Sequence, residues 1–377
     1  MKHKKGPHFP REDYAALALY TTERDPVEVD LSDNTNQWGA HPGALRAVRE
    51  ATERNLIRYP DFYSDELRQA AADRWGVGPG NVCTGAGSDH ILDSAFRACS
   101  VSGGVIAYAA PTFIMVETFA RANGHMTRKI TWAQALADPL RLLQDDPALV
   151  YVCRPNNPTG LLAPKEWLHR LLDAAGPKGP LVLVDEAYGD FAPPVESVIQ
   201  EAATRPRLLV VRTLSKAYGL AGLRVGVGIA SPEVAKEIEK SRGPYMVNSL
   251  AEAAGAAVLR DEEGWVERTV AECTRNRERL TEALRTRGLS PLPSAANFLM
   301  IPVPEGCALR YANGLRRKGV AIRPFPVMPD IGDGIRVTVG PWPLMERFLD
   351  TLDEVMGAEA SAAGVVVEVE QGRVAAP

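Results

Sequence analysis

The sequence predicts an α/β protein in which helices sandwich a mostly parallel sheet, with a smaller α+β domain after it. Between about residues 80 and 230, short β-branched runs alternate with helical stretches, which is the pattern of a parallel sheet. After Gly243-Pro244 the pattern changes to long helix and then to shorter strands. The chain has 377 residues, more than one hydrophobic core usually serves, so two domains are expected.

Five apolar runs are the expected strands of the large sheet. They are continuous rather than alternating, as in strands that helices cover on both faces. The runs are Gly104–Tyr108, Ala148–Cys153, Leu181–Asp185, Leu208–Arg212 and Arg224–Gly228. A helix is expected between the second and third runs, over residues 164–174.

The remaining segments divide the chain into an arm, two domains and a tail. The expected bounds are 1–30 for the N-terminal arm, 31–285 for the large domain, 286–356 for the small domain and 357–377 for the tail. Residues 248–287 are rich in Ala, Glu and Arg and are expected to form one long helix that joins the domains. Short strands at 297–301, 320–323 and 335–339 and a helix at 343–356 complete the small domain.

Composition argues against several classes of protein. A formal net charge of −4 without a basic block does not favour a nucleic-acid surface. Five cysteines, an odd number with no C-x-x-C pair, predict neither a disulfide framework nor a metal site and favour a cytoplasmic location. The sequence has no apolar run long enough to span a bilayer and no apolar leader segment, so neither membrane insertion nor export is expected.

The segment Arg212–Arg224 begins where an apolar run ends, and ligands in α/β sheets bind at the carboxyl ends of strands. The amine of Lys216 can form an imine with a cofactor aldehyde. Thr213, Ser215 and Arg224 can hold a phosphate through hydroxyl donors and a bidentate guanidinium. A surface lysine in a glycine-rich loop is the alternative, which the tripeptide Ser-Lys-Ala alone would favour.

Two further segments follow expected strands. Asp185 ends a buried run, where a carboxylate is costly unless it is paired. A pyridinium nitrogen is a suitable partner, with Tyr188 as a donor to the cofactor's ring oxygen; a helix cap is the alternative. Asn157, in Arg154-Pro-Asn-Asn-Pro-Thr-Gly160, could donate to the same oxygen, although this segment alone would favour a structural turn.

The segment Gly85-Ala-Gly-Ser-Asp89 precedes an apolar helix pattern. Backbone N–H groups at a helix N-terminus form an anion site, so Gly87, Ser88 and Asp89 could take a cofactor phosphate. Gly-Ser-Asp is also an ordinary helix cap, and this alternative stays open.

These motifs, in this order and spacing, resemble those of fold-type-I pyridoxal-5′-phosphate (PLP) enzymes of aminotransferase class I/II. Within that group the chain is most similar to histidinol-phosphate aminotransferases, over about residues 20–340. The resemblance implies the PLP transferase fold with a sheet of the seven-stranded type. It also implies a Schiff base on Lys216, Asp185 beside the ring nitrogen, and Tyr188 and Asn157 at the ring oxygen.

Other matches imply a homodimer and a stacking residue. Arg58-Tyr-Pro-Asp61 resembles the segment whose tyrosine reaches the neighbouring subunit's cofactor phosphate, which gives that role to Tyr59. Phe113 stands where an aromatic ring stacks on the cofactor, and it keeps the ring face without the hydroxyl of the usual tyrosine.

The resemblance also suggests substrate-binding residues. Arg323 and Arg336 stand where the family binds an anionic group of the substrate, and Tyr20 matches a tyrosine that helps to bind a substrate phosphate. Asn34 and Asn157 complete the expected substrate site. Thr35 replaces a glutamate that helps to recognise imidazole in this branch, so a related amine or amino acid is an open alternative donor.

The expected function is therefore PLP-dependent transfer of an amino group from a small anionic donor to a 2-oxo acid. A PLP-dependent decarboxylase of the threonine-phosphate type keeps the cofactor and breaks a different bond, and it is the main alternative. A PLP-binding regulator would normally carry a DNA-binding domain, and the region before the match has no basic recognition helix. A P-loop nucleotide-binding protein is excluded because the G-x-x-x-x-G-K-[S/T] motif is absent.

Overall fold

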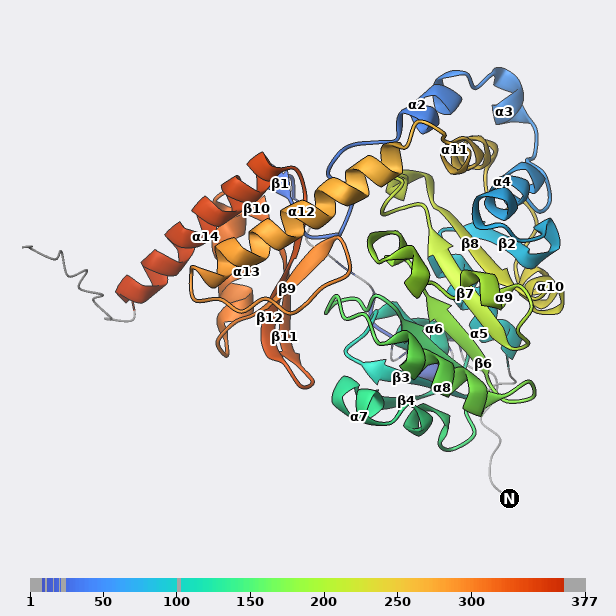
Figure 1. Ribbon diagram of the computed structural model, residues 1–377, viewed down its shortest axis with the longest axis horizontal. Coiled ribbons are helices and arrows are strands. Elements are labelled where there is room, and N and C mark those ends of the chain that lie inside the picture. The colour runs from blue at the N-terminus through green and yellow to red at the C-terminus, as the bar shows by residue number, and fades with distance from the viewer. Residues whose placement is uncertain are drawn as a thin grey trace, which may run out of the picture.

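The computed structural model describes residues 9–10, 12–15, 17–19, 21, 25–99 and 103–362. A large sheet covered by helices lies beside a smaller unit built on a second sheet, and α12 (Trp265–Arg285) runs from one toward the other (Figure 1). None of the helices in these ranges is both long enough and apolar enough to cross a membrane.

Within the described part of the chain the large sheet has seven strands, and all but one run parallel. Only β8 runs opposite to its two neighbours. The order across the sheet is β2 (Val82–Ala86), β8 (Val225–Ala230), β7 (Leu208–Thr213), β6 (Leu181–Asp185), β5 (Leu149–Cys153), β3 (Val105–Ala110) and β4 (Met126–Thr131). The predicted fold class is confirmed. Two strands were not among the expected runs, β2 and the partly exposed edge strand β4, because neither is a long apolar run.

Successive residues of one strand belong to two different cores. On β5, Leu149, Tyr151 and Cys153 face one hydrophobic cluster, and Val150 and Val152 face the other. Side chains of a strand alternate between the faces of a sheet, so a strand covered on both sides must be apolar throughout. This explains the continuous runs in the sequence.

Helices cover both faces of the large sheet. One face carries α5 (Ser88–Cys99), α6 (Met115–Ala122) and α10 (Pro232–Ser241), and the other carries α4 (Asp65–Trp75), α8 (Lys165–Ala175), α9 (Ile199–Ala202) and α11 (Ser249–Leu259). Shorter elements complete this part of the chain: α1 (Glu12–Ala15), α2 (Pro42–Arg49), α3 (Glu53–Ile57), α7 (Trp132–Ala137) and the 3₁₀ turns Pro79–Asn81, Pro139–Leu143, Gly189–Phe191, Pro194–Glu196 and Ala221–Leu223.

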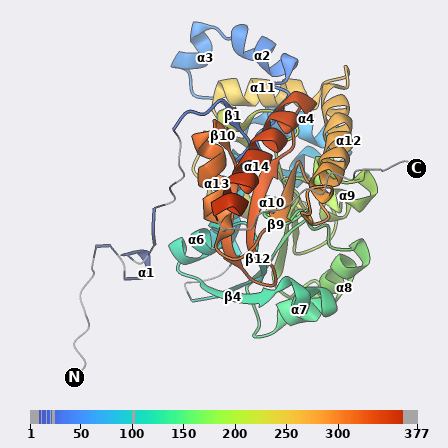
Figure 2. The ribbon, with the colours of Figure 1, turned by 90° about the vertical axis from the view of Figure 1, so that its left-hand side faces the viewer.

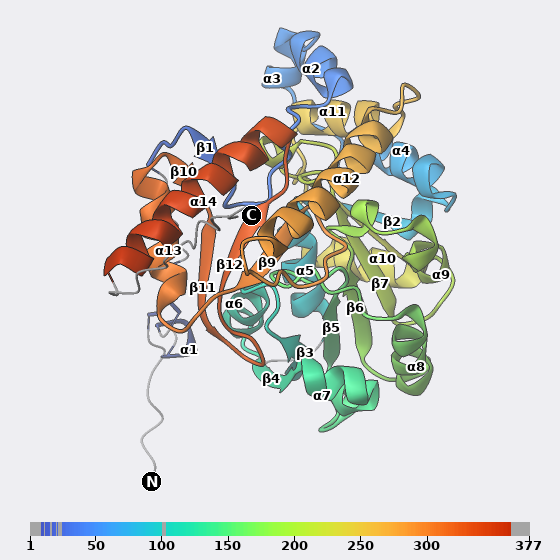
Figure 3. The ribbon, with the colours of Figure 1, turned by 60° about the vertical axis from the view of Figure 1, so that its left-hand side comes forward.

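The small sheet is antiparallel, with the order β11 (Arg323–Met328), β12 (Gly332–Thr338), β9 (Phe298–Pro302). Beside it, β1 (Val29–Asp30) pairs in parallel with β10 (Val320–Ala321). Helices α13 (Cys307–Arg317) and α14 (Trp342–Ala362) pack against each other next to this sheet (Figures 2 and 3). The last helix therefore continues past residue 356, where the sequence analysis ended it.

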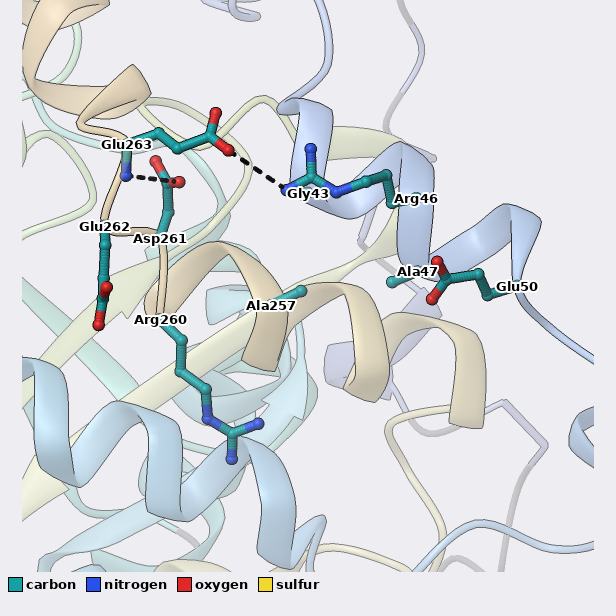
Figure 4. A pocket seen from close by; sticks show the side chains of 9 residues that line it. All are labelled: Gly43, Arg46, Ala47, Glu50, Ala257, Arg260, Asp261, Glu262 and Glu263. Carbon is teal, nitrogen blue, oxygen red and sulfur yellow. Dashed lines mark hydrogen bonds and ion pairs between the residues drawn. The ribbon is translucent and has the colours of Figure 1, made fainter.

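The prediction of one long helix over 248–287 is wrong, because α11 and α12 are separate helices. Gly264 adopts a left-handed φ of +71°, which interrupts the helical path. The Asp261 carboxylate accepts hydrogen bonds at 3.1 Å from the backbone N–H groups of Glu263 and Trp265, and these bonds hold the turn. Figure 4 shows this turn beside a hollow between α2 and α11.

Candidate active site

Lys216 lies in the loop that follows β7, at the carboxyl edge of the large sheet. Its Nζ donates a hydrogen bond to the backbone carbonyl of Asp33 at 3.0 Å and lies 5.8 Å from the centre of the Tyr188 ring. Burial, and after it the positive charge of Arg336, lowers the pKa of the Lys216 amine to about 8. A substantial fraction of this amine is therefore neutral near pH 8 and can act as a nucleophile or base.

Asp185 ends β6 and is only 3% exposed. Burial raises the pKa of its carboxyl group to about 6, against the effect of two hydrogen-bond donors. Oδ1 accepts from the backbone N–H of Ala187 at 3.0 Å, and Oδ2 accepts from the Tyr151 hydroxyl at 2.7 Å. Among the described residues no cationic side chain hydrogen-bonds to this buried carboxylate, so it fits a cationic nitrogen of a ligand.

Tyr188 is held by the loop that contains Asn34. The Asn34 amide Nδ2 donates to the Tyr188 hydroxyl at 3.0 Å, and Phe298 packs edge-on against the Tyr188 ring. Burial raises the pKa of the Tyr188 phenol, so the hydroxyl keeps its proton and can donate a hydrogen bond to an acceptor in the site. Asn34 is itself anchored, since its backbone N–H donates to Thr338 Oγ1 at 3.0 Å.

Asn157, in the loop after β5 of the large sheet, contacts Arg336 of the small sheet. Arg336 on β12 donates to Asn157 Oδ1 at 2.5 Å and to the backbone carbonyl of Ser32 at 2.7 Å. Its guanidinium carbon lies 5.3 Å from the ring centres of both Phe298 and Phe325. The arginine is 6% exposed and held at two sides, which presents a fixed cation to the site.

Arg224, Ser215 and Thr213 gather with the N-terminus of α5. Arg224 donates to Asp89 Oδ2 at 3.1 Å and to Ser215 Oγ at 3.5 Å, and the hydroxyls of Thr213 and Ser215 lie 3.0 Å apart. Ser88 begins α5, so the first backbone N–H groups of that helix have no helical partner. A guanidinium, two hydroxyls and free helix-end donors are the groups that hold a phosphate.

Thr213, Ser215, Arg224 and the N-terminus of α5 form a phosphate cradle, and Gly87 leaves the space that this cradle needs. It has a left-handed φ of +79°, and a Cβ atom there would lie 2.4 Å from Arg224 Nη2. Any larger residue would push the guanidinium out of the cradle. The residues thus fit PLP in three respects, with a nucleophilic lysine, a carboxylate for the ring nitrogen and a cradle for the phosphate.

Phe113 and Tyr59 lie in different surroundings. Phe113 follows β3, and its turn is tied to the Asn157 loop because Thr112 Oγ1 donates to Asn156 Oδ1 at 2.8 Å. Tyr59 is 81% exposed and stacks on Tyr245 with ring centres 4.7 Å apart.

Arg323 opens β11, directly opposite Arg336 in the register of the small sheet. Tyr20 lies outside the described residues.

Sequence reasoning missed two side chains that support the site. Tyr151 lies inside an apolar strand, and the only sign of its role was that a buried tyrosine needs a partner for its hydroxyl. Thr338 is fully buried and accepts the Asn34 N–H while donating to the carbonyl of Leu31 at 2.7 Å. Both contacts join residues far apart in sequence, so no local motif reveals them.

Comparisons with known proteins agree with this geometry. A family model for aminotransferase class I and II matches residues 26–352. A histidinol-phosphate aminotransferase from Methylobacillus flagellatus is 35% identical over 93% of this chain and 95% of that protein. An aromatic amino acid aminotransferase from Streptomyces coelicolor is 35% identical over 87% of this chain and 91% of that protein. The crystal structure of a histidinol-phosphate aminotransferase from Sinorhizobium meliloti in complex with pyridoxal-5′-phosphate has a TM-score of 0.82 and 26% identity, covering 89% of this chain and 92% of that one.

Proposed function

The chain belongs to the class I and II aminotransferases and uses pyridoxal phosphate, and on this premise we propose that its amino donor is a small amine or amino acid with an anionic group, of the histidinol-phosphate kind. A 2-oxo acid is the acceptor. Bound pyridoxal phosphate supplies the aldehyde that takes up the amino group and the ring that withdraws electrons from the substrate.

Each protein group has a proposed task. Lys216 would hold the cofactor, and its Nζ, whose pKa burial lowers to about 8, would take the proton from the substrate Cα. Asp185 stabilises positive charge at the ring nitrogen. Tyr188 and Asn157 donate to the ring oxygen. Thr213, Ser215 and Arg224, with the helix end at Gly87, Ser88 and Asp89, hold the phosphate. Phe113 stacks on the ring.

The choice of an anionic donor rests on one observation, the direct pairing of Arg323 with Arg336 across β11 and β12. Side chains directly opposite in an antiparallel pair lie on the same face of the sheet, so two guanidinium groups can converge on one anionic group of a substrate. Arg336 also contacts Asn157, which belongs to the proposed cofactor site. The anion-binding arginine and the reacting centre are therefore close enough for a small donor. Asn34 and Tyr20 are proposed to complete the substrate site.

Isotope transfer tests this proposal. The purified enzyme receives ¹⁵N-labelled histidinol phosphate and 2-oxoglutarate, and mass spectrometry follows the label. Labelled glutamate together with the carbonyl product supports the assignment. Histidinol without phosphate should react with a KM at least about tenfold higher, since it lacks a charge-assisted contact. Carbon dioxide release without labelled glutamate, with phosphothreonine as donor, would instead establish decarboxylation.

Absence of reaction with histidinol phosphate would reject this donor and leave the aminotransferase family untouched. Phenylalanine and tyrosine come next in that case, because one relative is named for aromatic amino acids. Labelled glutamate from these donors alone would show that Arg336 binds a carboxylate rather than a phosphate.

A homodimer is the proposed assembly, with Tyr59 reaching the neighbouring active site. An exposed apolar surface supports it, made of Leu56, Ile57, Tyr59, Phe62 and Tyr63. Exposed apolar groups gathered in one segment usually mark an interface. Tyr59 is not buried by its own chain, so its hydroxyl can serve another subunit. A cytoplasmic location is also proposed, since all five cysteines are free thiols.

A further inference from the structure

Tyr151 reaches the carboxylate of Asp185 from inside the sheet. It lies on β5 opposite Leu183, two residues before Cys153, which is the register partner of Asp185. Residues two apart on a strand share a face, so Tyr151 lies beneath the carboxylate. Its hydroxyl is 2.7 Å from Asp185 Oδ2, and the two residues are 1% and 3% exposed.

The direction of this hydrogen bond follows from chemistry. Burial raises the pKa of the Tyr151 phenol far above its usual value, so the hydroxyl keeps its proton and donates. Asp185 Oδ1 has its own donor, the backbone N–H of Ala187 at 3.0 Å. Each carboxylate oxygen is thus held by one donor, the Tyr151 hydroxyl or the Ala187 backbone N–H, and these two bonds fix the orientation of the group.

We propose that Tyr151 is a positioning residue whose hydroxyl orients the Asp185 carboxylate and holds its negative charge for the nitrogen of the cofactor ring. A charge-assisted hydrogen bond in a water-free site is strong, and its loss leaves a buried carboxylate short of one donor. The inference rests on the proposed role of Asp185.

Other titratable groups around Asp185 do not replace this contact. Asp89 at the start of α5 and the neighbouring Glu186 are acidic, and both raise the pKa of Asp185. Cys153 and Tyr188 are buried and keep their protons, since burial raises the pKa of each. Among the described side chains, Tyr151 is the one whose hydrogen bond to Asp185 favours its ionised form.

The neighbouring strand offers a matched control. Tyr108 on β3 is the register partner of Tyr151 and is 4% exposed. Its hydroxyl donates to Glu117 Oε2 at 3.5 Å, and Glu117 is not among the proposed site residues. Tyr108→Phe and Tyr151→Phe therefore remove the same atom from adjacent positions of the same sheet.

The test measures the dissociation constant of PLP by titrating cofactor-free protein between pH 6 and 8.5, alongside kcat and KM. Tyr151→Phe should weaken PLP binding about tenfold or more, with a larger loss toward pH 6, where the carboxylate takes up a proton. The value of kcat should fall by a similar factor while KM changes little. Tyr108→Phe should leave the PLP affinity and its pH dependence as in the wild type.

Asp185→Asn completes a double-mutant cycle on PLP affinity. In the Asp185→Asn background, Tyr151→Phe should have a much smaller effect than in the wild type. An undiminished effect, or a Tyr151→Phe protein that matches Tyr108→Phe, would overturn the inference. Wild-type PLP affinity and turnover in Asp185→Asn alone would instead refute the proposed role of Asp185.

Discussion

Gly226 on β8 touches the backbone of Gly87 so closely that no side chain fits between them. A Cβ atom at Gly226 would lie 2.4 Å from the carbonyl carbon of Gly87 and 2.4 Å from the backbone nitrogen of Ser88. These are backbone atoms, which cannot move away by a change of rotamer as a side chain can. The start of α5, with its phosphate-binding donors, is therefore set by the absence of a side chain on the neighbouring strand.

Gly226→Ala should destabilise the protein by about 1–3 kcal/mol through overpacking and weaken PLP binding by at least about tenfold, because the helix end must move. Denaturant unfolding and PLP titration measure the two effects. Gly222→Ala is the control, since a Cβ atom there meets nothing within 4 Å. Wild-type PLP affinity in Gly226→Ala would show that the cradle does not depend on this contact.

Most of the site could be predicted because its reactive side chains lie at or just after the ends of apolar strands. Asp185 ends a run that is apolar throughout, and Lys216 follows another. Parallel neighbours end at the same edge of a sheet, so two residues far apart in sequence were expected to meet there. The structure brings Lys216, Asp185, Tyr188 and Asn157 together, and the roles given to them stay predictions.

The missed features depend on contacts rather than on local pattern. The break between α11 and α12 depends on Asp261 turning back onto the backbone, in a segment whose composition favours helix. The contact of Asn34 with Tyr188 joins positions 154 residues apart, and it arises only when the loop after β1 lies against the loop after β6. Such contacts leave no periodicity in the sequence.

Lys216 should make the cofactor-free protein less stable at neutral pH. Its folded pKa is about 8 and its ordinary value is 10.5, so between these values the unfolded chain binds more protons. Stability should therefore rise with pH through this window. At pH 7 the free energy of unfolding of cofactor-free Lys216→Met should exceed that of cofactor-free wild type by about 1–2 kcal/mol. This gap between the two free energies should close toward pH 10.5.

Urea unfolding of both cofactor-free proteins from pH 7 to 10.5 measures this gap. A gap that stays constant over the range would mean that packing, not charge, separates the two proteins. Lys216→Met should also lack measurable turnover, whereas retained turnover would remove Lys216 from its proposed role.

Arg336→Lys should raise KM for an anionic donor by roughly ten- to a hundredfold, because an ammonium cannot reproduce the bidentate contact or bridge Asn157 and Ser32. Steady-state kinetics measures the change, with the exposed Arg285→Lys on α12 as control. Arg323→Lys should raise KM for a phosphate donor as well. An effect of Arg336→Lys on amino acids but not on phosphate donors would assign this arginine to a carboxylate.

Tyr59 should complement a defect in another subunit. A Tyr59→Ala subunit keeps Lys216, and a Lys216→Ala subunit keeps Tyr59, so their heterodimer contains one intact site if Tyr59 crosses the interface. Random mixing in equal amounts should restore about a quarter of wild-type activity, since half of the dimers are mixed and each has one working site. No recovery above the separate variants would place Tyr59 in the site of its own chain.

Asn34 combines a left-handed backbone, with a φ of 53°, and an amide that donates to Tyr188. Asn34→Gly keeps the backbone shape and removes the amide, so kcat should fall about five- to thirtyfold through loss of one hydrogen bond at a functional hydroxyl. Asn34→Ala removes the same amide and adds the cost of a left-handed alanine, about 1 kcal/mol of stability.

If the amide matters for turnover and the backbone only for folding, Asn34→Gly and Asn34→Ala will have the same kcat and different unfolding midpoints. Equal unfolding midpoints would show that the loop relaxes out of the left-handed conformation. A kcat that falls in Asn34→Ala alone would show that the backbone shape, and not the amide, positions Tyr188.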